Sequence, residues 1–131
     1  MNKRITRLLP DGAPGMDLEP MGYISPETVV DGTLDERGLM FFSNPEGTVN
    51  AGVWECTACT ERIMDYPYDQ CCFVLEGSLT ITDADGHSET FIPGDAFMIP
   101  RGFSGNWAMT ERYRNFFVTV EPPRPARGGN R

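Results

Sequence analysis

From residue 39 onward, short runs of apolar and aromatic residues alternate with polar residues, and turn-forming residues separate the runs. Alternation with a period of two, in segments spaced about 8–12 residues apart, is typical of the strands of a sandwich or a barrel. Patterns typical of helices are nearly absent. The sequence therefore predicts an all-β fold with strands at residues 39–43, 50–56, 70–77, 78–83, 89–92, 95–100, 105–109 and 115–121.

Two dipeptides mark turns within this region. Asp85-Gly86 is typical of a tight hairpin turn in which both residues take positive φ. In Pro93-Gly94, proline fixes φ for the second position of a type II turn, and glycine accepts the positive φ of the third. The only histidine, His87, follows the hairpin turn directly, so we interpret it as a solvated turn residue rather than a functional one.

The two ends of the chain differ from this middle part. Residues 1–37 contain four prolines and no sustained periodicity, which predicts an extended N-terminal arm with at most one short edge strand. Residues 121–131 are rich in Pro, Gly and Arg and are predicted to form a flexible C-terminal tail. Since 131 residues provide the core of one domain, we assign a single β-domain to residues 38–120.

The distribution of charge narrows the choice of partners. The net charge is −8, and all 19 acidic residues lie between residues 8 and 121, with only five arginines among them. Because phosphate backbones are bound by clustered Lys and Arg, we exclude nucleic acid as a partner. No run approaches the roughly 20 apolar residues of a membrane-spanning helix, and the basic start lacks the apolar core of a secretory signal. These features predict a cytoplasmic protein that does not bind membranes.

Two blocks of the sequence resemble the conserved blocks of the cupins. The first runs from Tyr68 to Gly86 and the second from Pro93 to Trp107, and the glycines and prolines in both fall at turns. In particular, the chain is similar to the small single-domain cupins related to (S)-ureidoglycine aminohydrolase and the ethanolamine-utilisation cupin. The resemblance covers residues 38–120 and implies an RmlC-like jelly-roll β-barrel with a ligand site inside its mouth.

The resemblance also implies where a metal would be held, because the metal-dependent cupins use histidines and a glutamate at fixed positions. Those positions correspond here to Gln70, Met64, Tyr66 and Gly105, or, with one residue of gapping, to Gln70, Ile63, Asp65 and Gly105. Divalent transition metals prefer imidazole, thiolate or carboxylate ligands. A thioether, a phenol, a neutral amide and a glycine do not form such a site. We therefore predict that the chain holds no metal and no other cofactor.

Other side chains are candidates for lining the mouth of the barrel. If Gln70 faces inward, the period of two places Cys72 on the same face and Phe73 outside. An amide suits recognition of amides, ureas or carboxylates, although it could also hold only water. Arginine side chains bind carboxylates through two parallel hydrogen bonds. Tryptophan side chains either line pockets or pack in the core. The predicted ligand-binding residues are Gln70, Cys72, Arg62, Arg101, Trp54 and Trp107.

Three hypotheses for function follow, and the first is favoured. The chain binds a small polar metabolite, nitrogen-bearing or carboxylate, in the barrel mouth. Alternatively, it is a metal-independent isomerase or lyase in which Tyr66 and Asp65 act as catalytic residues beside Gln70. The third hypothesis is a metalloenzyme with displaced ligands. Those ligands would come from Glu55, Asp65, Cys56 and Cys72.

The sequence also offers a surface for self-association. Phe73 and Leu75 are predicted to point out of the barrel, and the proline-rich arm adds further apolar residues. Contiguous exposed apolar patches mark interaction sites, and most soluble oligomers are symmetric assemblies of one chain. We therefore predict a homodimer.

Overall fold

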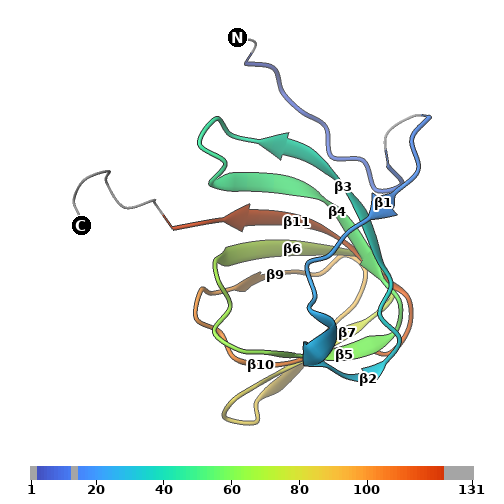
Figure 1. Cartoon of the computed structure of the whole chain (residues 1–131), viewed down its shortest axis with the longest axis vertical. Coiled ribbons are helices and arrows are strands. Elements are labelled where there is room, and N and C mark those ends of the chain that lie inside the picture. Colours follow the sequence, from blue (N-terminus) through green and yellow to red (C-terminus); the bar gives the residue numbers. More distant parts are fainter. Residues whose placement is uncertain (1–2, 13–14, 123–131) are drawn as a thin grey trace.

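The computed structural model describes residues 3–12 and 15–122, and these form two antiparallel β-sheets that face each other (Figure 1). The six-stranded sheet has the order β1 (Glu19–Pro20), β3 (Glu36–Ser43), β4 (Val49–Cys56), β11 (Tyr113–Val120), β6 (Asp69–Glu76) and β9 (Ala96–Ile99). The five-stranded sheet has the order β2 (Val29–Gly32), β5 (Cys59–Ile63), β10 (Gly105–Met109), β7 (Leu79–Asp83) and β8 (Ser88–Phe91). A single 3-10 turn, η1 (Pro26–Thr28), precedes β2.

The all-β prediction is confirmed, and each of the eight predicted runs contains a strand. The predicted jelly-roll β-barrel is not closed in the structure, because the strands pair within two separate sheets and no ladder joins the sheets in the described ranges. The sequence pattern also missed β5, which lies inside the second sheet between β2 and β10. No helix in the described part of the chain is long and apolar enough to span a membrane.

The two predicted turns are both present, with one difference in geometry. At Pro93-Gly94, the Asp95 N–H donates to the carbonyl of Ile92 at 2.9 Å and Gly94 has φ of 97°, as a type II turn requires. In the hairpin between β7 and β8, only Gly86 has positive φ. The predicted pair of positive φ values is therefore wrong, because the glycine alone takes the left-handed conformation.

The N-terminal residues contribute to both sheets. β1 pairs with β3 and β2 pairs with β5, so the first 37 residues carry two strands rather than at most one. The segment that precedes them leads away from the sheets in Figure 1. A hydrogen bond holds it to the six-stranded sheet, because the Arg114 side chain donates to the carbonyl of Pro10 at 2.9 Å. The predicted C-terminal tail lies, from residue 123 on, outside the described residues.

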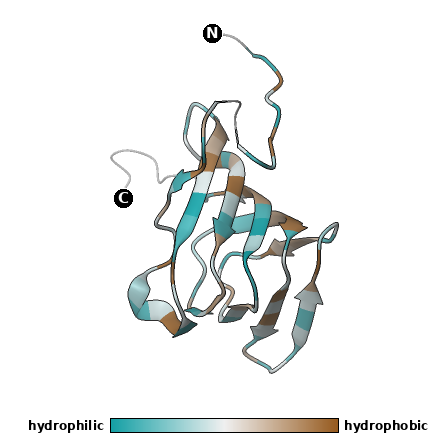
Figure 2. Cartoon of the chain, turned by 90° about the vertical axis from the view of Figure 1, so that its right-hand side faces the viewer, coloured by the Kyte–Doolittle hydropathy of each residue, from teal (hydrophilic) through white to brown (hydrophobic). Residues whose placement is uncertain are grey.

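The core lies between the sheets and follows from the alternation along each strand, which Figure 2 shows as bands of contrasting hydropathy. On β6, Cys72 and Val74 are fully buried, whereas Phe73 is 45% exposed. The predicted facing of this strand is confirmed. All four cysteines are free, and the sulfurs of Cys56 and Cys59 lie 3.9 Å apart within the core.

Candidate functional site

A cavity of about 220 Å³ lies between the two sheets. Strands β4, β6 and β11 of one sheet face β5 and β10 of the other across it, while η1 and the loop between β5 and β6 form its rim. Aromatic and polar side chains predominate in its walls. The lining residues are Tyr23, Ile24, Thr28, Trp54, Glu61, Arg62, Ile63, Met64, Tyr66, Pro67, Tyr68, Gln70, Trp107, Asn115, Phe117 and Thr119.

Gln70 and Tyr66 meet at one wall of the cavity. The Tyr66 hydroxyl donates to Oε1 of Gln70, and Nε2 of Gln70 donates to the sulfur of Cys72 at 3.1 Å. The backbone of Tyr66 is fixed as well, since its N–H donates to the carbonyl of Phe103 at 2.9 Å and its carbonyl accepts from Gly102 at 2.8 Å. The amide of Gln70 therefore has a defined orientation, with its oxygen toward Tyr66.

Burial determines the protonation states of the Tyr66 hydroxyl and the Cys72 thiol in this wall. It raises the pKa of the Tyr66 hydroxyl well above its ordinary value, and the neighbouring Tyr68 and Cys72 add to the effect. Burial also raises the pKa of Cys72 to about 12, although the hydrogen bond from Gln70 opposes the shift. Both groups are protonated at neutral pH. Tyr66 then acts as a hydrogen-bond donor rather than a base, and Cys72 is not a thiolate nucleophile.

Glu61 is the acidic residue among the described lining residues, and sequence reasoning missed it. It lies on β5 opposite Trp107 of β10, and it shares a face with the buried residues Cys59 and Ile63. The Thr28 hydroxyl donates to its carboxylate at 3.4 Å. Burial raises the pKa of Glu61 to about 7, with a further contribution from the charge of Glu36. The cavity therefore contains a carboxyl group that is partly protonated at neutral pH.

Two buried polar atoms of residues that line the cavity have no hydrogen-bond partner within the described residues. They are the indole N–H of Trp107, which is 5% exposed, and the side-chain oxygen of Asn115, which is 1% exposed. The amide nitrogen of Asn115 does have a partner, because it donates to the Tyr113 hydroxyl at 2.8 Å. An unpaired buried donor or acceptor costs about 1–3 kcal/mol. The residues around the cavity thus contain one unpaired donor and one unpaired acceptor.

Trp54 forms the wall next to this pair. Its indole N–H donates to Oε1 of Glu36 at 3.0 Å. The same carboxylate accepts from the backbone N–H groups of Tyr23 and Ile24, each at 3.0 Å. Glu36 is 5% exposed, so a buried carboxylate lies directly behind Trp54 of the cavity wall. Its partners are neutral N–H groups.

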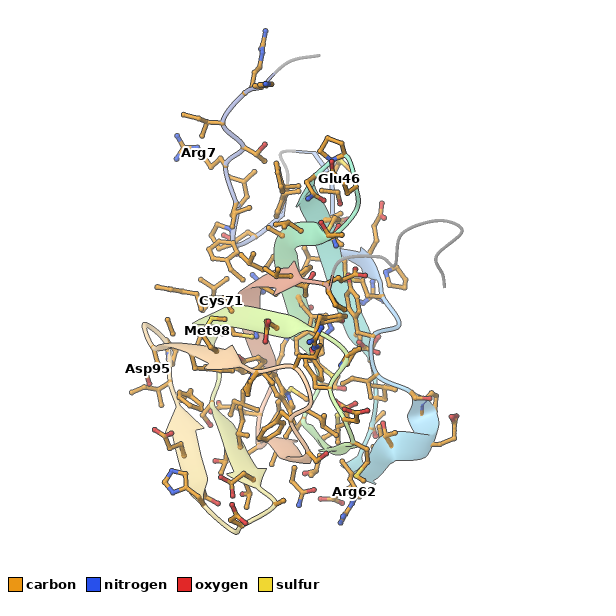
Figure 3. All side chains as sticks on the ribbon, turned by 90° about the vertical axis from the view of Figure 1, so that its left-hand side faces the viewer. Arg7, Glu46, Arg62, Cys71, Asp95 and Met98 are labelled. Atoms are coloured by element: carbon orange, nitrogen blue, oxygen red, sulfur yellow. The ribbon has the colours of Figure 1, made fainter. Side chains whose placement is uncertain are left out.

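The structure places the predicted binding residues in different surroundings. Gln70, Trp54 and Trp107 line the cavity together, and Cys72 lies behind Gln70. Arg62 reaches the rim, but it is exposed and lies at the outer edge of the molecule (Figure 3). Arg101 is exposed outside the lining, and its backbone N–H donates to Asp69 at 2.8 Å.

The remaining candidates from the resemblance also lie apart. Asp65 is exposed on the loop outside the lining, with φ of 52° and its N–H bonded to the Ser104 hydroxyl at 2.9 Å. Met64 lies at the rim and is 69% exposed. Beside Gly105, the ring of Phe103 occupies the space that a side chain would need, since a Cβ would lie 2.8 Å from that ring.

The alternative set of metal ligands does not come together. Glu55 lies on the outer face of the six-stranded sheet, bound to Arg112 and Arg114. Cys56 contacts Cys59 in the core. Across residues 3–12 and 15–122, no three His, Cys, Asp or Glu side chains are grouped so that they could hold a metal ion.

Comparison with known proteins places the chain in a family. Residues 43–117 match the model of the EutQ-like cupin domain. This chain is a member of the EutQ-like cupins. The resemblance to small cupins in the sequence is thereby confirmed. No curated protein matches this cupin significantly.

Solved structures share the fold of this cupin at low sequence identity. The EutQ protein of Clostridium difficile is 22% identical, with a TM-score of 0.59 over 75% of this chain and 79% of that one. A putative ethanolamine utilization protein Q of Salmonella typhimurium LT2 is 19% identical, with a TM-score of 0.59 over 82% and 98%. A protein of unknown function from Pseudomonas syringae is 21% identical, with a TM-score of 0.74 over 79% of this cupin. This cupin spans only 44% of that structure.

Proposed function

We propose that this cupin binds a compact, polar organic molecule in the cavity between its sheets. The observation that carries the proposal is the cavity itself, which is lined by six aromatic side chains and by the polar side chains of Gln70 and Glu61. Concave sites with apolar walls and a few placed polar groups are typical of small-molecule binding.

We propose further that binding does not depend on a metal. The residues at the positions where related cupins hold one do not fit that role. Tyr66 keeps its proton and bonds to Gln70, while Met64 is largely exposed. At Gly105 there is no donor atom, and Phe103 lies against it. This donor set suits hydrogen bonding to an organic ligand rather than coordination of a transition metal.

Acid–base catalysis is the second candidate, and Glu61 is the observation that favours it. A carboxyl group with a pKa near the working pH suits proton transfer. The isomerase or lyase hypothesis therefore depends on Glu61 rather than on Tyr66 and Asp65. Tyr66 is held protonated, and Asp65 lies outside the cavity lining.

Thermal unfolding in the presence of a panel of cationic, neutral and anionic small molecules tests the binding proposal. A ligand at 100 times its dissociation constant stabilises the folded state by about 2.7 kcal/mol. We expect at least one compound to raise the melting temperature of the wild type and to have a smaller effect on Trp107→Phe, which replaces one indole of the cavity wall. Ile92→Ala, at an exposed residue between β8 and β9, is the matched control. If no compound acts, or if Trp107→Phe responds like the wild type, the proposal is wrong.

We also propose that a second copy of this chain covers the outer face of the six-stranded sheet. Met98 and Phe73 are 62% and 45% exposed there. Cys71 pairs with Met98 across β6 and β9, and Figure 3 shows both at this face. On the other half of the face, Arg114 of β11 bonds to Asp11 of the N-terminal segment at 2.8 Å.

Charge supports a second copy as the occupant. The N-terminal segment begins with Lys3, Arg4 and Arg7, whereas the rest of the described chain is strongly acidic. Ile5 in this segment is fully exposed, so the segment extends beyond its own sheets (Figure 1). An extended basic segment is complementary to the acidic body of a second copy. The four free cysteines agree with the reducing cytoplasm in which we propose that this cupin acts.

A further inference from the structure

The walls of the cavity are rich in aromatic rings. Six of the sixteen lining residues are aromatic. The rings form edge-to-face pairs, with centroids 6.2 Å apart for Trp54 and Trp107 and 5.2 Å apart for Tyr66 and Tyr68. The faces of such rings attract cations within about 6 Å, and aromatic cages are used to recognise ammonium groups.

The charges around the cavity act in the same direction. Glu61 lies in the wall, and the buried carboxylate of Glu36 lies behind Trp54. Arg62 is the basic residue among the described lining residues, but it is exposed at the rim and water screens its charge. A carboxylate ligand would meet two carboxyl groups and no buried cation. An ammonium ligand would meet complementary charge.

From these observations we infer that the cavity selects a small organic ammonium ion in preference to carboxylates of the same size. The inference rests on the proposed binding function and narrows its ligand class. The ammonium group lies among the aromatic rings and pairs with Glu61.

Pairing with Glu61 makes the affinity depend on pH. Besides Glu61, the titratable groups that act on the site are Glu36, Tyr66, Tyr68 and Cys59. Burial raises the pKa values of both tyrosines and of Cys59, so these three groups stay neutral between pH 6 and 8. Because burial holds the pKa of Glu61 at about 7, the carboxylate form increases about tenfold over that range. Binding of an ammonium ion that stays protonated over this range should strengthen accordingly.

Intrinsic fluorescence reports directly on this site, because the only two tryptophans, Trp54 and Trp107, both line the cavity. Three probes of equal chain length separate the charge classes: 3-aminopropan-1-ol hydrochloride, propane-1,3-diol and 3-hydroxypropanoate. Each is titrated at constant ionic strength at pH 6 and pH 8. We expect the amine to bind most tightly and its affinity to rise about tenfold from pH 6 to pH 8.

Glu61→Gln tests the carboxylate, and Glu46→Gln, an exposed residue of the loop between β3 and β4, is its matched control. In Glu61→Gln, the amine should lose most of its affinity at pH 8 and the pH dependence should disappear, whereas Glu46→Gln should behave like the wild type. If the diol or the acid binds more tightly than the amine, the ammonium inference is wrong while the binding function stands. If the amine gives no response, or binds equally to Glu61→Gln, the inference is also overturned. The compound panel tests the binding function separately.

Discussion

Replacing Glu61 by glutamine should stabilise this cupin at neutral and alkaline pH. Glu61 lies in the cavity wall, where burial raises its pKa from the ordinary 4.5 to about 7. The folded state therefore binds a proton more tightly than the unfolded state does. The contribution of Glu61 to stability is greatest below pH 4.5 and is lost as the pH rises through 7, because the folded state must then hold an ionised carboxylate. Glutamine has no such ionisation.

The size of the effect follows from the shift in pKa. A difference of about 2.5 units corresponds to about 3 kcal/mol for a fully buried group. Glu61 is only partly buried, and solvent screening reduces the expected gain to about 1–2 kcal/mol at pH 8. This gain corresponds to an increase in melting temperature of roughly 3–8 °C for a domain of this size. At pH 5, most of the ionisation has not yet occurred, and the gain should fall to about a quarter.

Urea unfolding followed by tryptophan fluorescence at pH 5 and pH 8 measures the gain directly. Glu46→Gln removes one exposed carboxylate and serves as the control for the change in net charge. We expect Glu61→Gln alone to shift the midpoint upward at pH 8. The reasoning is refuted if Glu61→Gln is no more stable than the wild type at pH 8, or if its gain is the same at both pH values.

Two further predictions concern the outer face of the six-stranded sheet. Burial alone would raise the pKa of Glu55, but the hydrogen bonds and charges of Arg112 and Arg114 hold it below its usual value. Glu55→Gln should therefore destabilise the fold by about 2–3 kcal/mol at pH 7, and by less as the pH falls below about 4.5, as urea unfolding would show. Asp35→Asn, at an exposed ion pair of 3.9 Å, should cost less than about 0.5 kcal/mol. Met98→Asp should convert the proposed dimer into a monomer in light scattering, and a wild type that is already monomeric would contradict the proposed interface.

The period of two was sufficient to predict the strands in which apolar residues alternate clearly, but it missed β5. The sequence of β5, Cys-Thr-Glu-Arg-Ile, has two charged residues in five. Its partner strands β2 and β10 are distant from it in the sequence. No local sequence pattern indicates pairing between segments so far apart. Cys59, Glu61 and Ile63 do alternate with polar positions, and this was the available signal. This alternation was not recognised because a charged residue, Glu61, lies at the central inward-facing position of the strand.

The sequence identified the aromatic and amide walls of the cavity but not the sign of its charge. Trp54, Trp107 and Gln70 line the cavity because strand alternation fixes the face on which each lies. The arginines follow no such rule. Arg101 belongs to a turn whose direction depends on hydrogen bonds to Tyr66 and Asp69, far away in the chain. Because β5 was not predicted, Glu61 was not identified as a lining residue. The sequence therefore predicted arginines in the site where the structure has a carboxyl group.

Three features of the residues around the cavity destabilise the protein when no ligand is bound. Glu61 is held in a site that disfavours its charge, Trp107 has an unpaired donor and Asn115 has an unpaired acceptor. Each feature could be removed by a single substitution without changing the strand pattern. Sites that break the rules of stable packing in several ways at once are typically functional, because a ligand offsets the cost. The convergence of all three on one aromatic cavity is therefore a stronger argument for a ligand than any of them separately.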